Sequence, residues 1–351
     1  MSLEKLLSAL GDSISRMLVS MKRFVGNNWH GLLPPQYILS RRRFKRVVLD
    51  PPDLEPGSWR GAGKALVDYD SGLFWMTTRP RRATPIRGYA VEIYRSRDGD
   101  SYDLATVMDK ETVSSMAGIT VNSIEGQQLL RDPSTGRYHL YLSVDTPPAG
   151  WATLLLVADD PKGPWESRGI VMERGPGFDS MEARDATIDI VDGRYFALYK
   201  ASDGERIRMA LATSGDGVRW RKHGLLRLDG LEQPPALLLC GKILAGSLGP
   251  IFMGCESRAI VRGAMVGDTF AAYAIDHRGM NLERIFAARW DPRSPYERGD
   301  FPIHSYLDMV YDPFKDRLLM YVEAIDPKDI GLNQEVDRVL LYEVSLDGRT
   351  G

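Results

Sequence analysis

The chain has 351 residues, of which 43% are hydrophobic and 26% charged, and its formal net charge is −2. This length suffices for one large domain or two ordinary ones. The near-neutral charge gives no support to nucleic acid or an anionic membrane as partner, and no apolar run approaches the roughly 20 residues that span a bilayer. Glu4, Lys5, Asp12 and Arg16 interrupt the N-terminus, so it does not resemble a signal peptide and we expect a cytoplasmic protein.

Residues 3–24 have the only convincing helical pattern. The apolar positions alternate in spacings of four and three, at Leu3, Leu7, Leu10, Ile14, Met17, Met21 and Phe24. We therefore expect an N-terminal amphipathic helix (1–28) followed by a separate domain (29–351). The apolar stripe either packs on that domain or forms the contact of a homo-oligomer. The basic run at 41–46 is interpreted as a solvated face or as salt bridges between structural units.

After residue 50 the pattern changes to short β-type runs separated by Asp- and Gly-rich turns. One theme, a strand, a tight turn and an aromatic or branched strand, recurs at 67–81, 130–145, 188–203 and 310–326. A second hairpin follows at 91–108, 154–172 and 209–226. Two hairpins make a four-stranded antiparallel unit, and the unit recurs at the interval typical of propeller blades.

Four such units are clear, and a fifth must lie between residues 228 and 300, with candidate hairpins at 235–249 and 262–276. The fold class predicted is therefore all-β, a five-bladed β-propeller. A six-bladed propeller and a β-sandwich are the alternatives, and the repeat argues against the sandwich.

The first strand of each blade lines the axis of a propeller, so equivalent positions in these strands converge. Counting back from the turns, with GKIL (241–244) as the fourth turn, gives one axial position per blade: Gly61, Glu125, Asp185, Glu232 and Ser305. Three carboxylates around one channel would repel one another unless a ligand or cations compensate. Arg60 and Arg184 are placed to do so. Each carboxylate could instead pair with an arginine between blades or face solvent.

Cysteine and histidine give no sign of a cofactor or a metal. Cys240 and Cys255 are too few for a disulfide scaffold or a four-ligand zinc site, and the five histidines lack ligand spacing. The Asp-rich turns also lack the spacing of a calcium-binding loop. We expect two buried thiols, no metal and no cofactor.

The segment 181–203 (MEARDATIDIVDGRYFALYKASD), followed by 206–224, resembles the five-bladed glycosidases and glycoside phosphorylases. These comprise the arabinanase and β-xylosidase, invertase and levansucrase, and mannoside phosphorylase groups. Arg184-Asp185-Ala186 is similar to the R-D-P motif of invertases, Glu232-Gln233-Pro234 to their later E-C-P, and Ser214–Trp220 to their S-x-D-G-x-x-W segment. The resemblance implies the propeller fold and a glycoside substrate.

Cleavage of a glycosidic bond needs one acid and one carboxylate base or nucleophile. We assign Glu232 as the acid and Glu125 as the base. The resemblance implies that Asp185 stabilises charge at the sugar ring or tunes the acid. The residues expected to contact substrate or assist are Trp59, Arg60, Lys64, Glu182, Arg184, His304 and Asp308, with Tyr306 as a further stacking surface.

One departure from the family pattern concerns blade one, which usually supplies an aspartate. Here Gly61 stands at that place, with Arg60 beside it and Lys64 further along. Cations at this position would suit a phosphorylase, which must hold phosphate. From the resemblance and the assigned acid and base, the predicted function is a glycoside hydrolase. The alternatives are a glycoside phosphorylase, separated by phosphate-dependent turnover, and a non-catalytic carbohydrate-binding or scaffold propeller.

Overall fold

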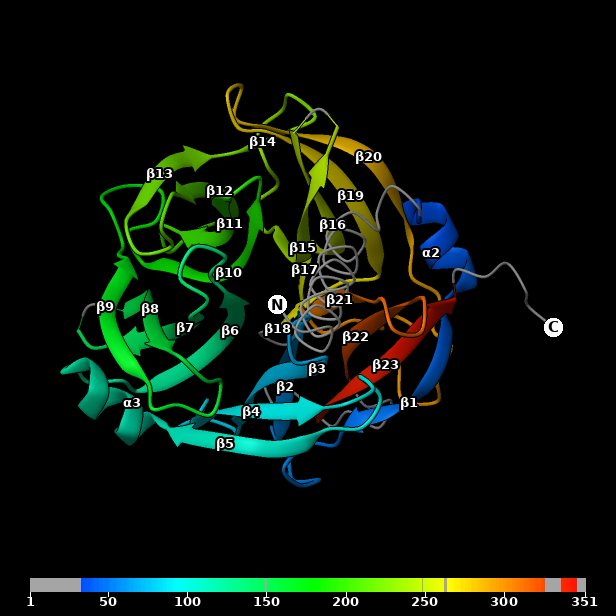
Figure 1. The fold of residues 1–351 in the computed structure, drawn as a ribbon. Coiled ribbons are helices and arrows are strands. Elements are labelled where there is room, and N and C mark those ends of the chain that lie inside the picture. The colour runs from blue at the N-terminus through cyan, green and yellow to red at the C-terminus, as the bar shows by residue number, and fades with distance from the viewer. Residues whose placement is uncertain (1–32, 149, 248, 262–263, 326–335, 346–351) are drawn as a thin grey trace, which may run out of the picture.

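The computed structural model describes residues 33–148, 150–247, 249–261, 264–325 and 336–345. The helix predicted over 3–24 lies outside these residues. Within them, radially arranged antiparallel sheets surround one axis, so the fold is a five-bladed β-propeller as predicted (Figure 1). None of the helices in the described ranges is long and apolar enough to cross a membrane.

Each of the first three blades combines the two hairpins predicted for it. Blade 1 comprises β2 (Trp59–Asp68), β3 (Leu73–Arg81), β4 (Ala90–Ser96) and β5 (Asp103–Asp109). Blade 2 comprises β6 (Ser123–Arg131), β7 (Tyr138–Thr146), β8 (Gly150–Ala158) and β9 (Glu166–Met172). Blade 3 comprises β10 (Glu182–Val191), β11 (Arg194–Ser202), β12 (Ile207–Ser214) and β13 (Trp220–Leu225). Helix α3 (Lys110–Ala117) connects blades 1 and 2, begins at the Asp109 cap and ends at Gly118.

Blade 4 lies in the predicted region, but the hairpins predicted for it are wrong. It comprises β15 (Leu238–Gly246), β16 (Gly249–Ser257), β19 (Thr269–Asp276) and β20 (Asn281–Arg289), with β14 (Arg227–Leu228) beside β20 and the pair β17 (Ala259–Val261) and β18 (Ala264–Val266) between the hairpins. The GKIL segment lies inside β15 and is not a turn. Gly241 faces Gly254 in this ladder, and a Cβ atom on Gly241 would lie 2.2 Å from the carbonyl oxygen of Met253. The glycine therefore permits close backbone approach.

The last blade is closed by the start of the described chain. It comprises β21 (Leu307–Asp312), β22 (Arg317–Ile325), β23 (Asp337–Ser345) and, as its outermost strand, β1 (Arg43–Leu49). The short helix α2 (Pro35–Arg41) precedes β1. Arg42 between them is 1% exposed and its guanidinium lies 4.0 Å from the ring centre of Trp290. The basic run thus contributes to a buried contact between blades, through an arginine stacked on aromatic rings in place of the salt bridges expected as one alternative.

The hydrophobic core is divided among the blade interfaces. Among the described residues, five large apolar clusters each combine side chains of two neighbouring blades. Phe270 of blade 4 packs with Met320 of blade 5, for example, and Val67 of blade 1 with Leu319 of blade 5. Because every blade buries both faces in this way, the ring holds the inner strands at fixed positions around the axis.

Candidate functional site

The axial positions of blades 1 to 3 lie at matching irregularities of the inner strands. The register shifts between Gly61 and Lys64 in β2, between Ile124 and Gln127 in β6, and between Arg184 and Thr187 in β10. Glu125 and Asp185 occupy these bulges, and Asp185 has a φ of 51°. A left-handed aspartate within a strand is uncommon, and strained backbone of this kind clusters at functional sites.

Glu125 and Asp185 meet in a set of ionised side chains that we name the axial cluster: Arg79, Arg81, Arg87, Glu125, Glu182, Arg184, Asp185 and Lys200. The arginines at 79 and 81 end β3, Arg87 follows it, and Lys200 lies in β11. Two of the three predicted catalytic residues are therefore brought together at one mouth of the axis.

Glu125 is held by three arginines of the preceding blade. Its carboxylate lies 2.9 Å from Nε of Arg79 and 3.2 Å from the guanidinium nitrogens of Arg81 and Arg87, and its side chain is 3% exposed. Burial opposes ionisation, but the arginine charges outweigh it and hold the pKa of this carboxyl well below its usual range. An acid so strongly ionised is a weak proton acceptor at neutral pH, which favours an electrostatic role for Glu125 over the predicted role as base.

The other half of the cluster surrounds Asp185. Its Oδ1 accepts from the backbone N–H of Gly126 at 3.2 Å, and its Oδ2 lies 3.4 Å from Arg184 and 3.9 Å from Lys200. Glu182 pairs with the same two cations, at 3.2 and 3.1 Å. Burial raises the pKa of Glu182, but Arg184 and Lys200 outweigh it and lower that pKa to about 2.

Cations outnumber carboxylates in the axial cluster by five to three. The excess remains when Glu323, which acts on Arg79 from outside the cluster, is included. Burial and the neighbouring arginines lower the pKa of Arg81, and burial and Arg184 lower that of Lys200. The Nη1 of Arg79 and the Nε of Arg81 and Arg184 are buried without a hydrogen-bond acceptor among the described residues. These donors suit an anion or a polyhydroxylated ligand.

Two tryptophans flank the cluster, and arginines cover their faces. Arg81 lies 4.0 Å from the ring centre of Trp59, and Arg184 lies 4.1 Å from that of Trp151. The predicted stacking residue Trp59 is 4% exposed and also contacts the edge of His304. Trp59 therefore positions the guanidinium of Arg81 through a cation–π contact.

Six predicted residues lie outside the cluster: Trp59 and His304 border it, and Arg60, Lys64, Glu232 and Asp308 lie elsewhere. Glu232 precedes β15 on the surface, where its side chain is 72% exposed and pairs with Arg206 at 2.7 Å. The misplaced fourth turn explains this error, because the count from the true turn does not end at Glu232. Arg60 pairs with Glu92 of β4 at 2.9 Å, and Lys64 donates to the carbonyl of Gly241 further along the axis.

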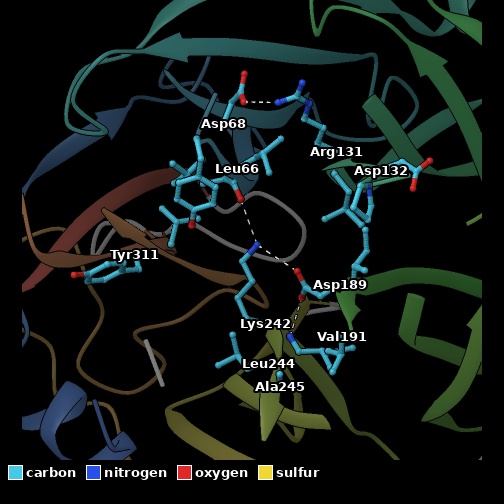
Figure 2. Close-up of a pocket in the computed structure, with 18 of the residues that line it drawn as sticks. Leu66, Asp68, Arg131, Asp132, Asp189, Val191, Lys242, Leu244, Ala245 and Tyr311 are labelled. Atoms are coloured by element: carbon cyan, nitrogen blue, oxygen red, sulfur yellow. Dashed lines mark hydrogen bonds and ion pairs between the residues drawn. The ribbon is translucent and has the colours of Figure 1, made fainter. Parts of the chain in front are cut away.

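Asp308 lies deeper still, toward the opposite mouth. It accepts from the backbone N–H of Ala65 at 2.7 Å and lies 3.4 Å from Nζ of Lys242. At that mouth the turns of the inner hairpins surround a cavity of about 570 Å³, with Lys242 and Asp189 at its floor (Figure 2). The axis thus has two chemically different ends.

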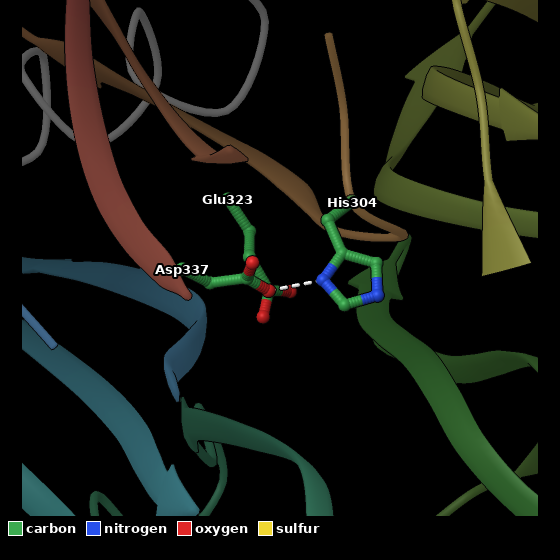
Figure 3. Close-up of side chains that lie close together, drawn as sticks. All are labelled: His304, Glu323 and Asp337. Carbon is green, nitrogen blue, oxygen red and sulfur yellow. Dashed lines mark hydrogen bonds and ion pairs between the residues drawn. The ribbon is translucent and has the colours of Figure 1, made fainter. Parts of the chain in front are cut away.

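The predicted site residue His304 belongs to a group of three next to the axial cluster (Figure 3). Its Nδ1 pairs with Asp337, Glu323 lies beside them, and their ligand atoms all lie within 4.8 Å of one another. Gly61 makes room for this group, because a Cβ atom there would lie 1.8 Å from Oε1 of Glu323. Imidazole and carboxylate donors at this spacing could hold a divalent cation. Sequence spacing gave no sign of the group, since its members come from separate segments of blade 5.

Sequence reasoning missed Arg79, Arg81, Arg87 and Lys200. The run TTRPRR (77–82) at the end of a predicted inner hairpin was a signal, because its alternate arginines at 79 and 81 share one face of the sheet. Glu125, the partner of the three arginines, lies on the next blade, and pairing between blades leaves no sequence pattern. Lys200 pairs instead with Glu182 and Asp185 of its own blade.

Solved structures of known proteins share this architecture. β-1,2-Mannobiose phosphorylase from Listeria innocua matches with a TM-score of 0.56 and 14% identity, over 88% of this chain and 97% of that one. A thermostable family-43 glycoside hydrolase matches with a TM-score of 0.57 and 11% identity, over 85% and 90%. A family 117 glycoside hydrolase from Zobellia galactanivorans matches with a TM-score of 0.56 and 14% identity, over 89% and 92%.

The chain has the five-bladed β-propeller fold of the glycosidases and glycoside phosphorylases. The resemblance seen in the sequence is confirmed at the level of the fold. No family model matches the sequence, and no curated protein matches it. At these identities the likeness shows the fold alone.

Proposed function

We propose that this propeller is a glycoside-active enzyme in which inorganic phosphate, held by the axial cluster, attacks the glycosidic carbon. The observation that supports phosphorolysis is the excess of cations, five against three carboxylates, in the buried axial cluster. Phosphorolysis needs one acid and an anion site, whereas hydrolysis needs a second carboxylate that activates water or attacks the sugar.

The carboxylates of the axial cluster are not equally suited to act as the acid. Blade one offers Gly61 at its axial position, and Glu125 is neutralised by three arginines. Asp185 has more distant cations, at 3.4 and 3.9 Å, so it is the carboxyl assigned to proton transfer. In the proposed step a phosphate oxygen forms a bond to the anomeric carbon, the bond to the leaving oxygen breaks, and Asp185 gives that oxygen a proton.

The arginines have a defined part in this step. Arg79 and Arg81 present buried N–H groups that would bind phosphate oxygens, and Arg81 is fixed against Trp59. Arg87, 33% exposed, is the cation nearest to solvent and would receive the incoming anion. Hydrolysis remains the second candidate, because Glu125 and Asp185 share the mouth where the sequence placed them.

The test is turnover of a glycoside panel with and without phosphate, with products identified by ³¹P NMR. The panel begins with β-1,2-mannobiose, on which the Listeria innocua enzyme is named to act. We expect a sugar phosphate that forms only with phosphate present. Turnover without phosphate would instead indicate hydrolysis, and no turnover of any glycoside would favour a binding propeller.

Two variants compare a carboxylate of the axial cluster with a carboxylate on the surface. Asp185→Asn is expected to lower kcat by at least about a hundredfold, the usual contribution of a general acid. Glu232→Gln removes an exposed carboxylate outside the cluster and is expected to leave turnover unchanged. Equal activity in both variants would place the acid elsewhere.

A further inference from the structure

The cavity at the opposite mouth of the axis is built from all five blades. Its walls come from β2, β6, β10, β15 and β21 and the turns that follow the first three of them, and its volume is about 570 Å³ (Figure 2). Sites for small molecules have volumes of roughly 300–1,000 Å³ and apolar walls with a few placed polar groups. The cavity has both properties.

The polar groups at its floor retain hydrogen-bonding capacity. Nζ of Lys242 lies 3.3 Å from the carbonyl of Ala65, 3.4 Å from Asp308 and 3.7 Å from Oδ1 of Asp189. These separations exceed the roughly 2.7–2.9 Å of a good charged hydrogen bond. Asp189 uses Oδ2 to accept from the N–H of Ile243 at 2.7 Å, which leaves Oδ1 toward the cavity. Lys242 and Asp189 are each 9% exposed, so the floor is largely shielded from bulk solvent.

The walls and the rim determine which ligands suit this floor. The apolar wall residues include Leu66, Val67, Leu130, Val191, Leu244 and Val310. At the rim Arg131 pairs with Asp68 at 2.8 Å. The carboxylates of the lining, at positions 68, 70, 132, 189 and 192, outnumber its two cations, Arg131 and Lys242. A negatively charged ligand is therefore disfavoured.

We propose that this cavity is a second, non-catalytic binding site for a small hydroxyl-rich ligand without negative charge, such as a neutral sugar. One hydroxyl accepts from the ammonium of Lys242 while its neighbour donates to Oδ1 of Asp189, and the C–H faces of the ring lie on the apolar walls. This site would disfavour anions, whereas the cationic axial cluster would favour them. The proposal for this cavity does not depend on the function proposed above.

Saturation-transfer NMR tests this site with glucose, methyl mannoside and xylose as neutral probes and gluconate as the anionic match. All measurements use an Asp185→Asn background, and each variant is checked for folding by circular dichroism. Ala245→Trp fills the cavity from its partly exposed rim at the end of β15, whereas Ser247→Trp places the same ring two residues further on, outside the lining. Asp189→Asn removes the charge of the acceptor at the floor.

At least one neutral probe is expected to bind while gluconate does not. Binding should be lost in Ala245→Trp, kept in Ser247→Trp, and weakened about tenfold in Asp189→Asn, the size of one hydrogen bond to a charged group. Glycoside turnover without the background substitution should be the same in Ala245→Trp as in the wild type. Absence of binding by every neutral probe, equal binding of gluconate, or binding that survives both Ala245→Trp and Asp189→Asn would overturn the proposal.

Discussion

Replacing Glu125 by glutamine distinguishes two roles of the arginines around it: partners in a structural ion pair, and a binding site for an anion. The carboxylate is 3% exposed and lies within 3.2 Å of three arginines, so its loss leaves several buried charges without compensation. Removing one partner of a buried ion pair costs about 3–5 kcal/mol. We expect Glu125→Gln to lower the free energy of unfolding by about 3 kcal/mol in phosphate-free buffer, measured by urea denaturation.

Phosphate should then distinguish the two roles. With Glu125 neutral, the cations lack a competing negative charge, and phosphate should bind about tenfold more tightly, since a like charge a few ångström away costs more than about 1.4 kcal/mol. Phosphate at ten times its Kd should restore about 1.4 kcal/mol of stability. The matched control Glu232→Gln should change stability by less than about 0.5 kcal/mol.

The dependence of protein stability on pH also reports on Glu125. The folded-state pKa of Glu125 is depressed, so its contribution to stability is complete above the unfolded value near 4.5 and declines as the pH falls below it. The variant should lack this decline. A Glu125→Gln protein as stable as wild type, or one whose lost stability does not respond to phosphate, would refute the reasoning.

Three further predictions concern the ring and its opposite mouth. Burial, only partly offset by Lys242, raises the pKa of Asp189 to about 6. The free energy of unfolding should therefore fall by about 2–3 kcal/mol through this group as the pH rises from 4 to 6. Urea denaturation at a series of pH values should show this decrease in the wild type and not in Asp189→Asn. Gly61→Ala places a Cβ atom against the buried carboxylate of Glu323 and should lower stability by about 1–3 kcal/mol in thermal or urea melts, whereas Gly193→Ala, whose Cβ would meet no atom within 4 Å, should cost less despite its positive φ. Deleting residues 43–49 removes β1 from blade 5. We expect the shortened protein to lack the single cooperative unfolding transition of the wild type in urea or thermal melts. An unchanged transition would contradict the role of β1 in closing the ring.

Local pattern made most of the fold predictable. The hairpins of blades 1, 2 and 3 have Asp- and Gly-rich turns, and the observed strands follow them. The turn of the first hairpin of blade 4 has no aspartate, and the segment from Gly241, which permits close strand pairing, was interpreted as that turn. The closing strand β1 was missed because its basic residues were interpreted as a solvated face or as salt bridges between units, and Arg42 just before it stacks on Trp290 inside the blade interface.

The site was predictable only where it lies on the repeated inner strands. Glu125 and Asp185 occupy equivalent bulges, so the alignment of blades found both. Arg79 and Arg81 reach Glu125 from another blade, and that distance along the chain hides the pairing. The error at Glu232 followed from the error in the turn.

Calorimetric titration of inorganic phosphate tests the anion site at the axial cluster most directly. Arg87 is the most exposed of the arginines on Glu125, so Arg87→Gln is expected to fold, and Arg206→Gln is its control outside the cluster. We expect phosphate to bind the wild type and Arg206→Gln equally and to bind Arg87→Gln about tenfold more weakly. Failure of phosphate to bind the wild type, or equal affinity in Arg87→Gln, would contradict an anion site at this mouth of the propeller.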